Sequence, residues 1–298
     1  MKKRTKKKIG KFFTGLFKFF FKLIFIYPFT GLWWVLKHSY IAITEVFSKK
    51  SPSRNKKSLS TKETKSKDMQ EEKHTITKGK KNAEAHHEPL LEVAHKKGNF
   101  EKFQKKLYTN NSTIGLILGA RGTGKSAIGM RILENFKTQS DKHIYCMGFK
   151  AAAIPNWITL VSHVDDIENG SVLLVDEGGI EFSSRKSMSD ANTFLSDILL
   201  VARHKDLSVL FITQNSANLE INVIRQADYL VMKPSSLLQK DFERTKIKKV
   251  YESIEEEFEE MKGMLGVTYI YADNYRGFVT NSLPSFWSEA ASKGYSGK

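Results

Sequence analysis

A loop of eight residues, 119–126, constrains the fold of this 298-residue chain more than any other feature. It fits the phosphate-binding loop pattern G-x-x-x-x-G-K-S/T at every fixed position. An apolar run typical of a strand, residues 113–118, precedes it, and a helical pattern, residues 127–136, follows it. A helix that begins after a glycine-rich loop presents free N–H groups and the positive end of its dipole to an anion. The sequence therefore predicts a strand, a loop and a helix that together bind the phosphates of a nucleotide.

The fixed positions of this loop suit a triphosphate and its metal ion. Glycines let backbone N–H groups approach the phosphates closely, and Lys125 can reach the β- and γ-phosphates. The Ser126 hydroxyl is suited to bind Mg²⁺. We expect the ligands to be ATP and Mg²⁺, held by Gly119, Gly122, Thr123, Gly124, Lys125, Ser126 and Ala127.

A second apolar run, residues 172–175, ends in two carboxylates about fifty residues after the loop. A buried strand of this kind delivers Asp176 to the carboxyl edge of a sheet, where it can hold Mg²⁺ together with Ser126. Glu177, the next residue, is placed to polarise a water for attack on the γ-phosphate. A kinase gains nothing from activating water, so the pair predicts ATP hydrolysis rather than phosphoryl transfer to a small substrate.

Three further polar residues are candidates for the catalytic site. Gln214 closes the next apolar strand, residues 209–213, where its side chain can hydrogen-bond the γ-phosphate or the attacking water. Arg203 and Arg225 are candidates for stabilising the transferred phosphoryl group from a neighbouring subunit. The alternative for each arginine is a plain surface position.

Near-continuous apolar runs alternate with helical patterns in the second half of the chain. Such runs are typical of a parallel sheet covered on both faces, which predicts an α/β fold with a central, mostly parallel sheet. The expected strands are residues 113–118, 143–149, 157–161, 171–176, 208–214 and 228–233, with a hairpin of 267–272 and 276–280. The expected helices are residues 91–107, 127–136 and 189–204, and one long polar helix, 237–264.

The net charge of +16 is concentrated in the N-terminal third. Residues 1–90 contain 22 Lys and Arg against 7 Asp and Glu, whereas residues 91–298 contain 26 against 25. The nucleotide-binding part is therefore nearly neutral, and its net charge gives no evidence that it binds DNA.

The N-terminal region, residues 1–47, combines lysines with an aromatic stretch. Its longest charge-free run, residues 23–36, is 14 residues long. As a helix this run spans about 21 Å, short of the ~30 Å hydrocarbon core of a bilayer. Three arrangements fit: a spanning helix, a hairpin bent at Pro28 and Gly31, and a helix that lies in the interface. Basic residues flank the stretch on both sides, which favours the hairpin and the interfacial helix. We predict membrane association through residues 12–47.

Residues 48–89 are rich in Lys, Ser, Thr and Glu and nearly free of large apolar side chains. Such a segment cannot bury enough apolar surface to offset the entropy of ordering it. The expected organisation is a membrane-associated segment (1–47), a disordered linker (48–89) and an ATPase domain in the cytoplasm (90–298).

The order of these motifs resembles that of a known superfamily over roughly residues 110–235. The loop at 119–126 is followed by the acidic pair 176–177, by the Arg203-His204 pair, by the strand that Gln214 closes, and by Arg225. This order resembles the zonular-occludens-toxin-like ATPases of filamentous phages and, more broadly, the FtsK–HerA superfamily of DNA-pumping motors. The N-terminal membrane segment is an arrangement of FtsK-type translocases and departs from that of the phage proteins.

The resemblance implies a RecA-like P-loop core, a homo-oligomeric ring and work on DNA, with Gln214 as a sensor of the γ-phosphate. The predicted function is that of a membrane-tethered, ATP-hydrolysing motor that moves DNA in viral genome packaging, virion extrusion or DNA transfer, with virion or coat proteins as further candidate partners. One alternative is a membrane-associated assembly ATPase that acts on protein subunits, which the near-neutral domain favours. The other is a nucleotide-gated membrane scaffold without turnover.

Overall fold

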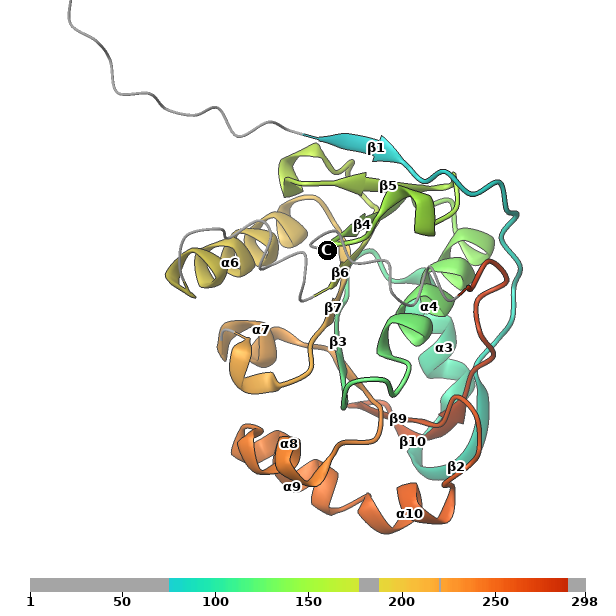
Figure 1. Cartoon of the computed structure of the whole chain (residues 1–298), viewed down its shortest axis with the longest axis vertical. Helices are drawn as coiled ribbons and strands as arrows, with labels where there is room; N and C mark the ends of the chain where they lie inside the picture. Colours follow the sequence, from blue (N-terminus) through green and yellow to red (C-terminus); the bar gives the residue numbers. More distant parts are fainter. Residues whose placement is uncertain (1–74, 177–187, 220, 289–298) are drawn as a thin grey trace, which may run out of the picture. The chain divides into compact units, whose positions relative to one another are not determined.

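The computed structural model describes residues 75–176, 188–219 and 221–288. They form a ten-stranded mixed sheet with helices on both faces (Figure 1). The strands are β1 (Ile76–Lys78), β2 (Leu91–Gly98), β3 (Ile114–Leu118), β4 (Ile144–Met147), β5 (Ile158–Val161), β6 (Val172–Asp176), β7 (Ser208–Ile212), β8 (Tyr229–Met232), β9 (Thr268–Ala272) and β10 (Tyr275–Thr280). The α-helices are α3 (Phe100–Thr109), α4 (Lys125–Gln139), α6 (Met188–His204), α7 (Ile221–Gln226), α8 (Leu237–Phe242), α9 (Thr245–Glu252) and α10 (Glu255–Glu260). Short 3₁₀ turns are η2 (Ala151–Ala153), η3 (Val164–Asp166) and η4 (Ser216–Asn218).

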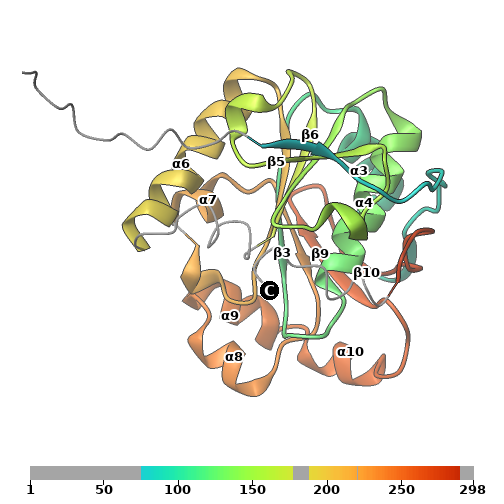
Figure 2. The same ribbon diagram turned by 45° about the horizontal axis from the view of Figure 1, so that its top comes forward.

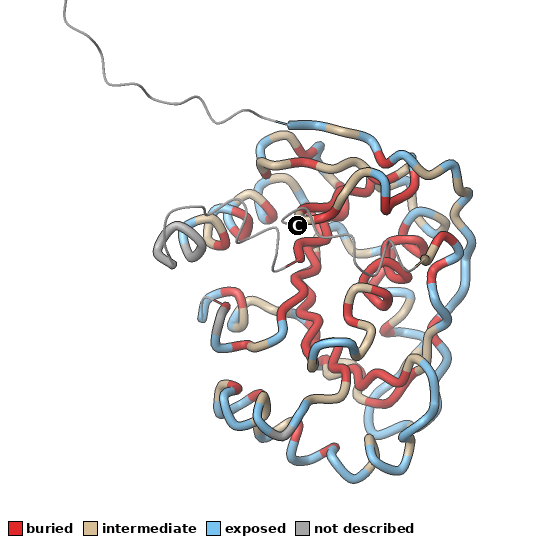
Figure 3. The backbone as a smooth tube through the Cα atoms, viewed as in Figure 1, coloured by how far each residue is buried: buried red, intermediate tan, exposed pale blue. Residues whose placement is uncertain are grey.

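Six parallel strands form the middle of the sheet, in the order β5-β4-β6-β7-β3-β8. Strand β1 pairs antiparallel with β5 at one edge, and β9, β10 and β2 continue antiparallel from β8 to the other edge. Strands β3, β6 and β7 are buried along their whole length (Figure 3), because helices cover both sides of them. Their continuous apolar sequences follow from this double coverage.

The two faces of the sheet carry different helices (Figures 1 and 2). Helices α3 and α4 pack on one face against alternate strand residues such as Ile117 and Leu174. Helices α6, α7 and α9 pack on the other face, against residues such as Leu116 and Val175. Neighbouring residues of one strand thus point to opposite faces, as the two-residue period of a strand requires. The expected α/β class, with a central sheet flanked by helices, is confirmed.

The prediction of one helix over residues 91–107 is wrong in its first half. Strand β2 occupies this part and pairs with the outer side of β10. Gly98 has a φ of 90°, which ends the strand, and the Asn99 side chain accepts a hydrogen bond from Lys102 N at 2.7 Å to cap α3. The free edge of β10, which comes from the far end of the chain, therefore overrides a local helical pattern.

The single long helix expected over residues 237–264 is also wrong, because three short helices, α8, α9 and α10, occupy it. The first break lies at Glu243 and Arg244, whose side chains bind the chain around η4. The Glu243 carboxylate accepts a bond from Ser216 N at 2.9 Å, and Arg244 donates to Leu219 O at 2.6 Å. These bonds require an extended backbone at 243–244, which stops the helix.

Two segments from opposite ends of the described chain lie against α4. The buried ion pair of Arg131 and Glu134, 2.8 Å apart, joins them to the helix. Glu134 accepts hydrogen bonds from the backbone N–H of His86 and of Ser285, both at 3.1 Å. Arg131 pairs with Glu88 at 2.8 Å and donates to the carbonyl of Leu283. We call Arg131, Glu134 and these four partners the α4 clamp.

Residues 75–89 fall within the range that the composition assigned to a linker, and the structure places them on the sheet and on the α4 clamp. Polar bonds rather than apolar burial hold most of this segment, which is why composition does not reveal it. The predicted membrane segment, residues 12–47, and the linker up to residue 74 lie outside the described residues. In the described part of the chain, no helix is both long enough and apolar enough to cross a membrane.

Candidate nucleotide-binding site

The predicted phosphate-binding loop joins β3 to α4 at the carboxyl edge of the parallel strands. Gly119, Gly122 and Gly124 have φ angles of 146°, 80° and 88°. Residues other than glycine rarely adopt such positive values. The Lys125 ammonium donates to the carbonyl oxygens of Gly119 and Ala120, both at 2.9 Å, so its side chain folds back over its own loop. These bonds leave the lysine only 8% exposed. The loop and the first turn of α4 thus form a compact cradle of N–H groups and one cation.

The Ser126 hydroxyl and the Asp176 carboxylate meet at this edge. Ser126 Oγ lies 3.3 Å from Asp176 Oδ2, although the two residues are 50 positions apart. Asp176 ends β6 and is 3% exposed. A hydroxyl and a carboxylate are the oxygen ligands that Mg²⁺ prefers, and such sites are completed by waters and substrate phosphates. Within the described ranges, no cluster of three or more His, Cys, Asp or Glu side chains forms a metal site. The Ser126–Asp176 pair fits such a Mg²⁺ site.

Gln214 belongs to the same edge of the sheet. It follows β7, which lies between β3 and β6 and pairs in parallel with both. Thr213, the residue before it, donates its backbone N–H to Ile117 O at 3.1 Å. The side chain of Gln214 is exposed, and its carbonyl accepts a bond from the Gln239 side chain of α8. The predicted role of Glu177 falls on a residue outside the described ranges.

Arg203 and Arg225 lie at the other end of the strands. Arg203 is in the last turn of α6, and the next residues lead into the start of β7. Arg225 is in the last turn of α7, just before Asp228, whose backbone N–H donates to Ile114 O at the start of β3. Both arginines are exposed. The fold therefore separates them from the phosphate-binding loop of their own chain, and a role in a neighbour's site stays a prediction.

Lys233 is a residue at this edge that the sequence reasoning missed. It follows β8, is 2% exposed, and lies against the phosphate-binding loop. Burial lowers the pKa of its ammonium to about 7. The signal was present in the sequence, because strands β6, β7 and β8 are each followed or closed by a polar side chain at the edge where ligands bind.

No family model and no curated protein sequence matches the chain. Among solved structures, it is similar to the genome packaging NTPase B204 of Sulfolobus turreted icosahedral virus 2 in complex with AMP, with 16% identity over 59% of this chain and 100% of that one, at a TM-score of 0.39. It is similar to the type VII secretion ATPase EccC of Thermomonospora curvata, with 12% identity over 62% and 28% of the two chains, at a TM-score of 0.39. It is also similar to EssC of Geobacillus thermodenitrificans, with 13% identity over 70% and 48%, at a TM-score of 0.40.

Proposed function

We propose that the chain is a Mg²⁺-dependent P-loop ATPase with a RecA-like core. The observation that carries this proposal is the 3.3 Å approach of Ser126 Oγ to Asp176 Oδ2 beside a loop of three glycines in left-handed or related conformations. A serine that begins a helix after such a loop, and an acidic residue that ends a neighbouring parallel strand, are the protein ligands of Mg²⁺ in P-loop NTPases.

The residues divide the reaction between binding and water activation. The N–H groups of the loop and the Lys125 ammonium hold the β- and γ-phosphates. Ser126 and Asp176 would hold Mg²⁺, which when bound would neutralise charge on the phosphate oxygens. Glu177 accepts a proton from a water whose oxygen attacks the γ-phosphorus. The bond between that phosphorus and the bridging oxygen of the β-phosphate breaks, and ADP leaves. Gln214, at the edge shared by β3, β7 and β6, orients the water or binds the γ-phosphate.

The proposed cargo is DNA, moved by a ring of identical chains that residues 12–47 tether to a membrane. The order of the motifs supports DNA as the cargo. The exposed positions of Arg203 and Arg225, away from the loop of their own chain, support the ring, because from there the two side chains can reach the site of a neighbouring chain. The near balance of charge over residues 91–298 favours the second candidate, a motor that acts on protein subunits.

The ATPase assignment is tested by turnover and binding measurements on the full chain. Lys125→Ala should abolish both ATP binding and hydrolysis, and Glu177→Gln should keep binding and stop hydrolysis. Arg121→Ala is the matched control, because Arg121 is an exposed residue at a variable position of the same loop. Unchanged hydrolysis in Lys125→Ala would refute the site, and persistent turnover in Glu177→Gln would assign water activation to another residue.

The cargo is tested by adding duplex DNA to the wild-type chain at low salt. A DNA motor should hydrolyse ATP faster when DNA is present. A rate that is indifferent to DNA would favour the motor that acts on protein subunits.

A further inference from the structure

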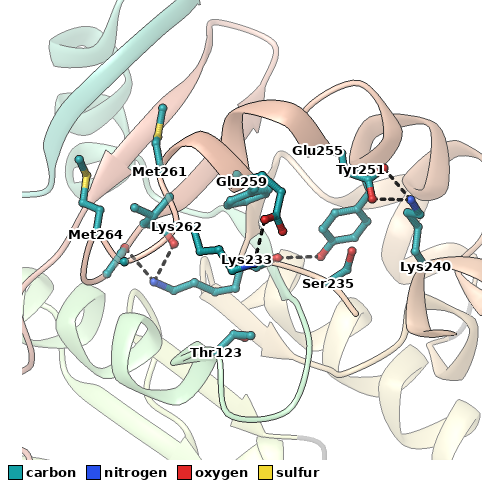
Figure 4. Close-up of a pocket in the computed structure, with 15 residues that line it drawn as sticks. Thr123, Lys233, Ser235, Lys240, Tyr251, Glu255, Glu259, Met261, Lys262 and Met264 are labelled. Carbon is teal, nitrogen blue, oxygen red and sulfur yellow. Dashed lines mark hydrogen bonds and ion pairs between the residues drawn. The ribbon is translucent and has the colours of Figure 1, made fainter. Parts of the chain in front are cut away.

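The Lys233 side chain lies beneath the phosphate-binding loop. A Cβ atom built on Gly119 would come within 2.6 Å of Lys233 Cβ, and one built on Gly124 would lie 3.9 Å from Lys233 Cε. The aliphatic stem therefore runs from the first glycine of the loop to the last one. Figure 4 shows the stem beside Thr123, which lies on the same loop.

The backbone around Lys233 also holds the loop where it leaves β3. Lys233 N donates to Leu118 O at 2.8 Å, and Pro234 O accepts from Ala120 N at 2.9 Å. These two bonds continue the parallel pairing of β3 with β8 into the first residues of the loop. A change in the position of Lys233 is thus transmitted directly to the loop that holds the phosphates.

The ammonium of Lys233 is held by the segments that flank the β9–β10 hairpin. It donates to Gly266 O at 2.8 Å and to Val267 O at 3.2 Å, the two bonds that Figure 4 includes. It also donates to Asn281 Oδ1 at 3.2 Å. Among the described residues these three uncharged oxygens are its hydrogen-bond partners. Because no carboxylate neutralises it, a buried cation of this kind interacts strongly with other charges nearby.

The other charged groups around Lys233 are largely compensated. They line a cavity of about 290 Å³ that Lys233 shares with α9, α10 and the loop before β9. Lys240 pairs with Glu255 at 2.6 Å, and Lys262 pairs with Glu259 at 2.9 Å. The Tyr251 hydroxyl donates to Lys233 O at 3.2 Å, and burial raises the pKa of this tyrosine well above its usual value. On the loop itself, the Lys125 ammonium is bound to the carbonyl oxygens of Gly119 and Ala120.

We propose that Lys233 is a positioning residue for phosphate binding: its stem supports the loop between Gly119 and Gly124, and its ammonium supplies a second positive charge behind that loop. This inference rests on the proposed nucleotide binding. It assigns a function to a lysine outside the motif and links the loop to the β9–β10 hairpin.

The charge of Lys233 responds to the nucleotide. Burial alone sets its pKa at about 7, so near neutral pH the ammonium is only partly protonated. The negative phosphates of a bound nucleotide favour the charged form and raise this pKa. Binding therefore takes up a proton, and the affinity falls as the pH rises above about 7, by up to about tenfold per pH unit until the pKa of the complex is reached.

The test is calorimetric titration of the full chain with Mg²⁺ and ATPγS at pH 6.5, 7.5 and 8.5. Wild type should lose affinity as the pH rises, and Lys233→Met should bind more weakly at pH 6.5, with no such pH dependence. Lys233→Arg, which stays charged, should restore affinity and also remove the pH dependence. Lys262→Met is the matched control, since Lys262 lines the same cavity but its side chain is 76% exposed. It should keep the wild-type pH profile.

A second variant, which leaves Lys233 in place, tests its role in nucleotide binding if Lys233→Met does not fold. Asn281→Asp places a carboxylate beside the ammonium without changing the size of the side chain, so the loss of affinity should move to higher pH. Equal pH profiles in wild type, Lys233→Met and Asn281→Asp would overturn the role of Lys233 while leaving nucleotide binding intact. If wild type and Lys125→Ala both fail to bind ATPγS, the proposed ATPase itself is refuted.

Discussion

Arg131 and Lys233 are both cations buried next to the nucleotide-binding element, but they differ in their partners. Arg131, 1% exposed, lies on α4 between the carboxylates of Glu134 and Glu88. Lys233, 2% exposed, meets only uncharged oxygens among the described residues. The ion pairs of Arg131 hold distant segments of the chain against the helix. The charge of Lys233, which has no ion pair among the described residues, depends on pH and on the ligand. A buried cation is thus structural or responsive according to whether a carboxylate faces it.

The largest expected effect on stability comes from removing the buried ion pair of Arg131 and Glu134. Arg131→Met leaves the Glu134 carboxylate, which is 0% exposed, without its cation. We expect a loss of about 3–5 kcal/mol in the free energy of unfolding, measured by urea denaturation. Glu88→Gln is the control, because Glu88 is 53% exposed and its pair should contribute less than about 1 kcal/mol. Equal effects of the two changes would show that the buried pair with Glu134 contributes no more to stability than the exposed pair with Glu88.

The next effect tests the contact between Lys233 and the loop. Gly119→Ala drives a methyl group to within 2.6 Å of Lys233 Cβ, whereas Gly122→Ala meets nothing within 4 Å. Both changes also strain a backbone at positive φ, but only Gly119→Ala adds a clash with Lys233. We expect Gly119→Ala to destabilise the protein by about 2–3 kcal/mol and Gly122→Ala by about 1 kcal/mol in thermal unfolding. A reversed order would contradict the placement of Lys233 under the loop.

The smallest effect concerns the unpaired cation itself. Its pKa is about 7 in the folded state and near 10.5 when exposed, so the unfolded chain binds more protons between these values. Stability from this group therefore rises with pH above about 7 and is lost as the pH falls toward 7. We expect wild type to gain about 1 kcal/mol per pH unit between pH 7.5 and 9 relative to Lys233→Met, measured by urea unfolding at each pH. Parallel pH curves for the two proteins would show that Lys233 does not titrate in this range.

The sequence predicted the parts of the site that depend on local order along the chain. The loop at 119–126 and the strand that ends at Asp176 can each be identified from their own residues alone. The sheet then brings Ser126 and Asp176 together. Helix α6 and the β9–β10 hairpin were predicted for the same reason.

The parts that sequence reasoning missed depend on distant partners. Strand β2 forms because β10 offers it an edge, and α8 ends because Glu243 and Arg244 bind the chain around η4. The burial of Lys233 likewise depends on Gly266 and Asn281, more than thirty residues further along the chain. None of these pairings leaves a periodic pattern in the residues that form it.

Both outer edges of the sheet come from one short stretch of chain. Strands β1 and β2, within residues 76–98, cover β5 at one edge and β10 at the other. Uncovered edges present rows of unpaired N–H and C=O groups to which other molecules can add, whereas short or irregular outer strands rich in lysine discourage this. Strand β1 has three residues, and β2 has register shifts and the side chains of Lys96 and Lys97. A truncated protein that begins after residue 98 would expose both edges at once, and we expect it to aggregate, whereas one that begins before residue 75 should stay soluble.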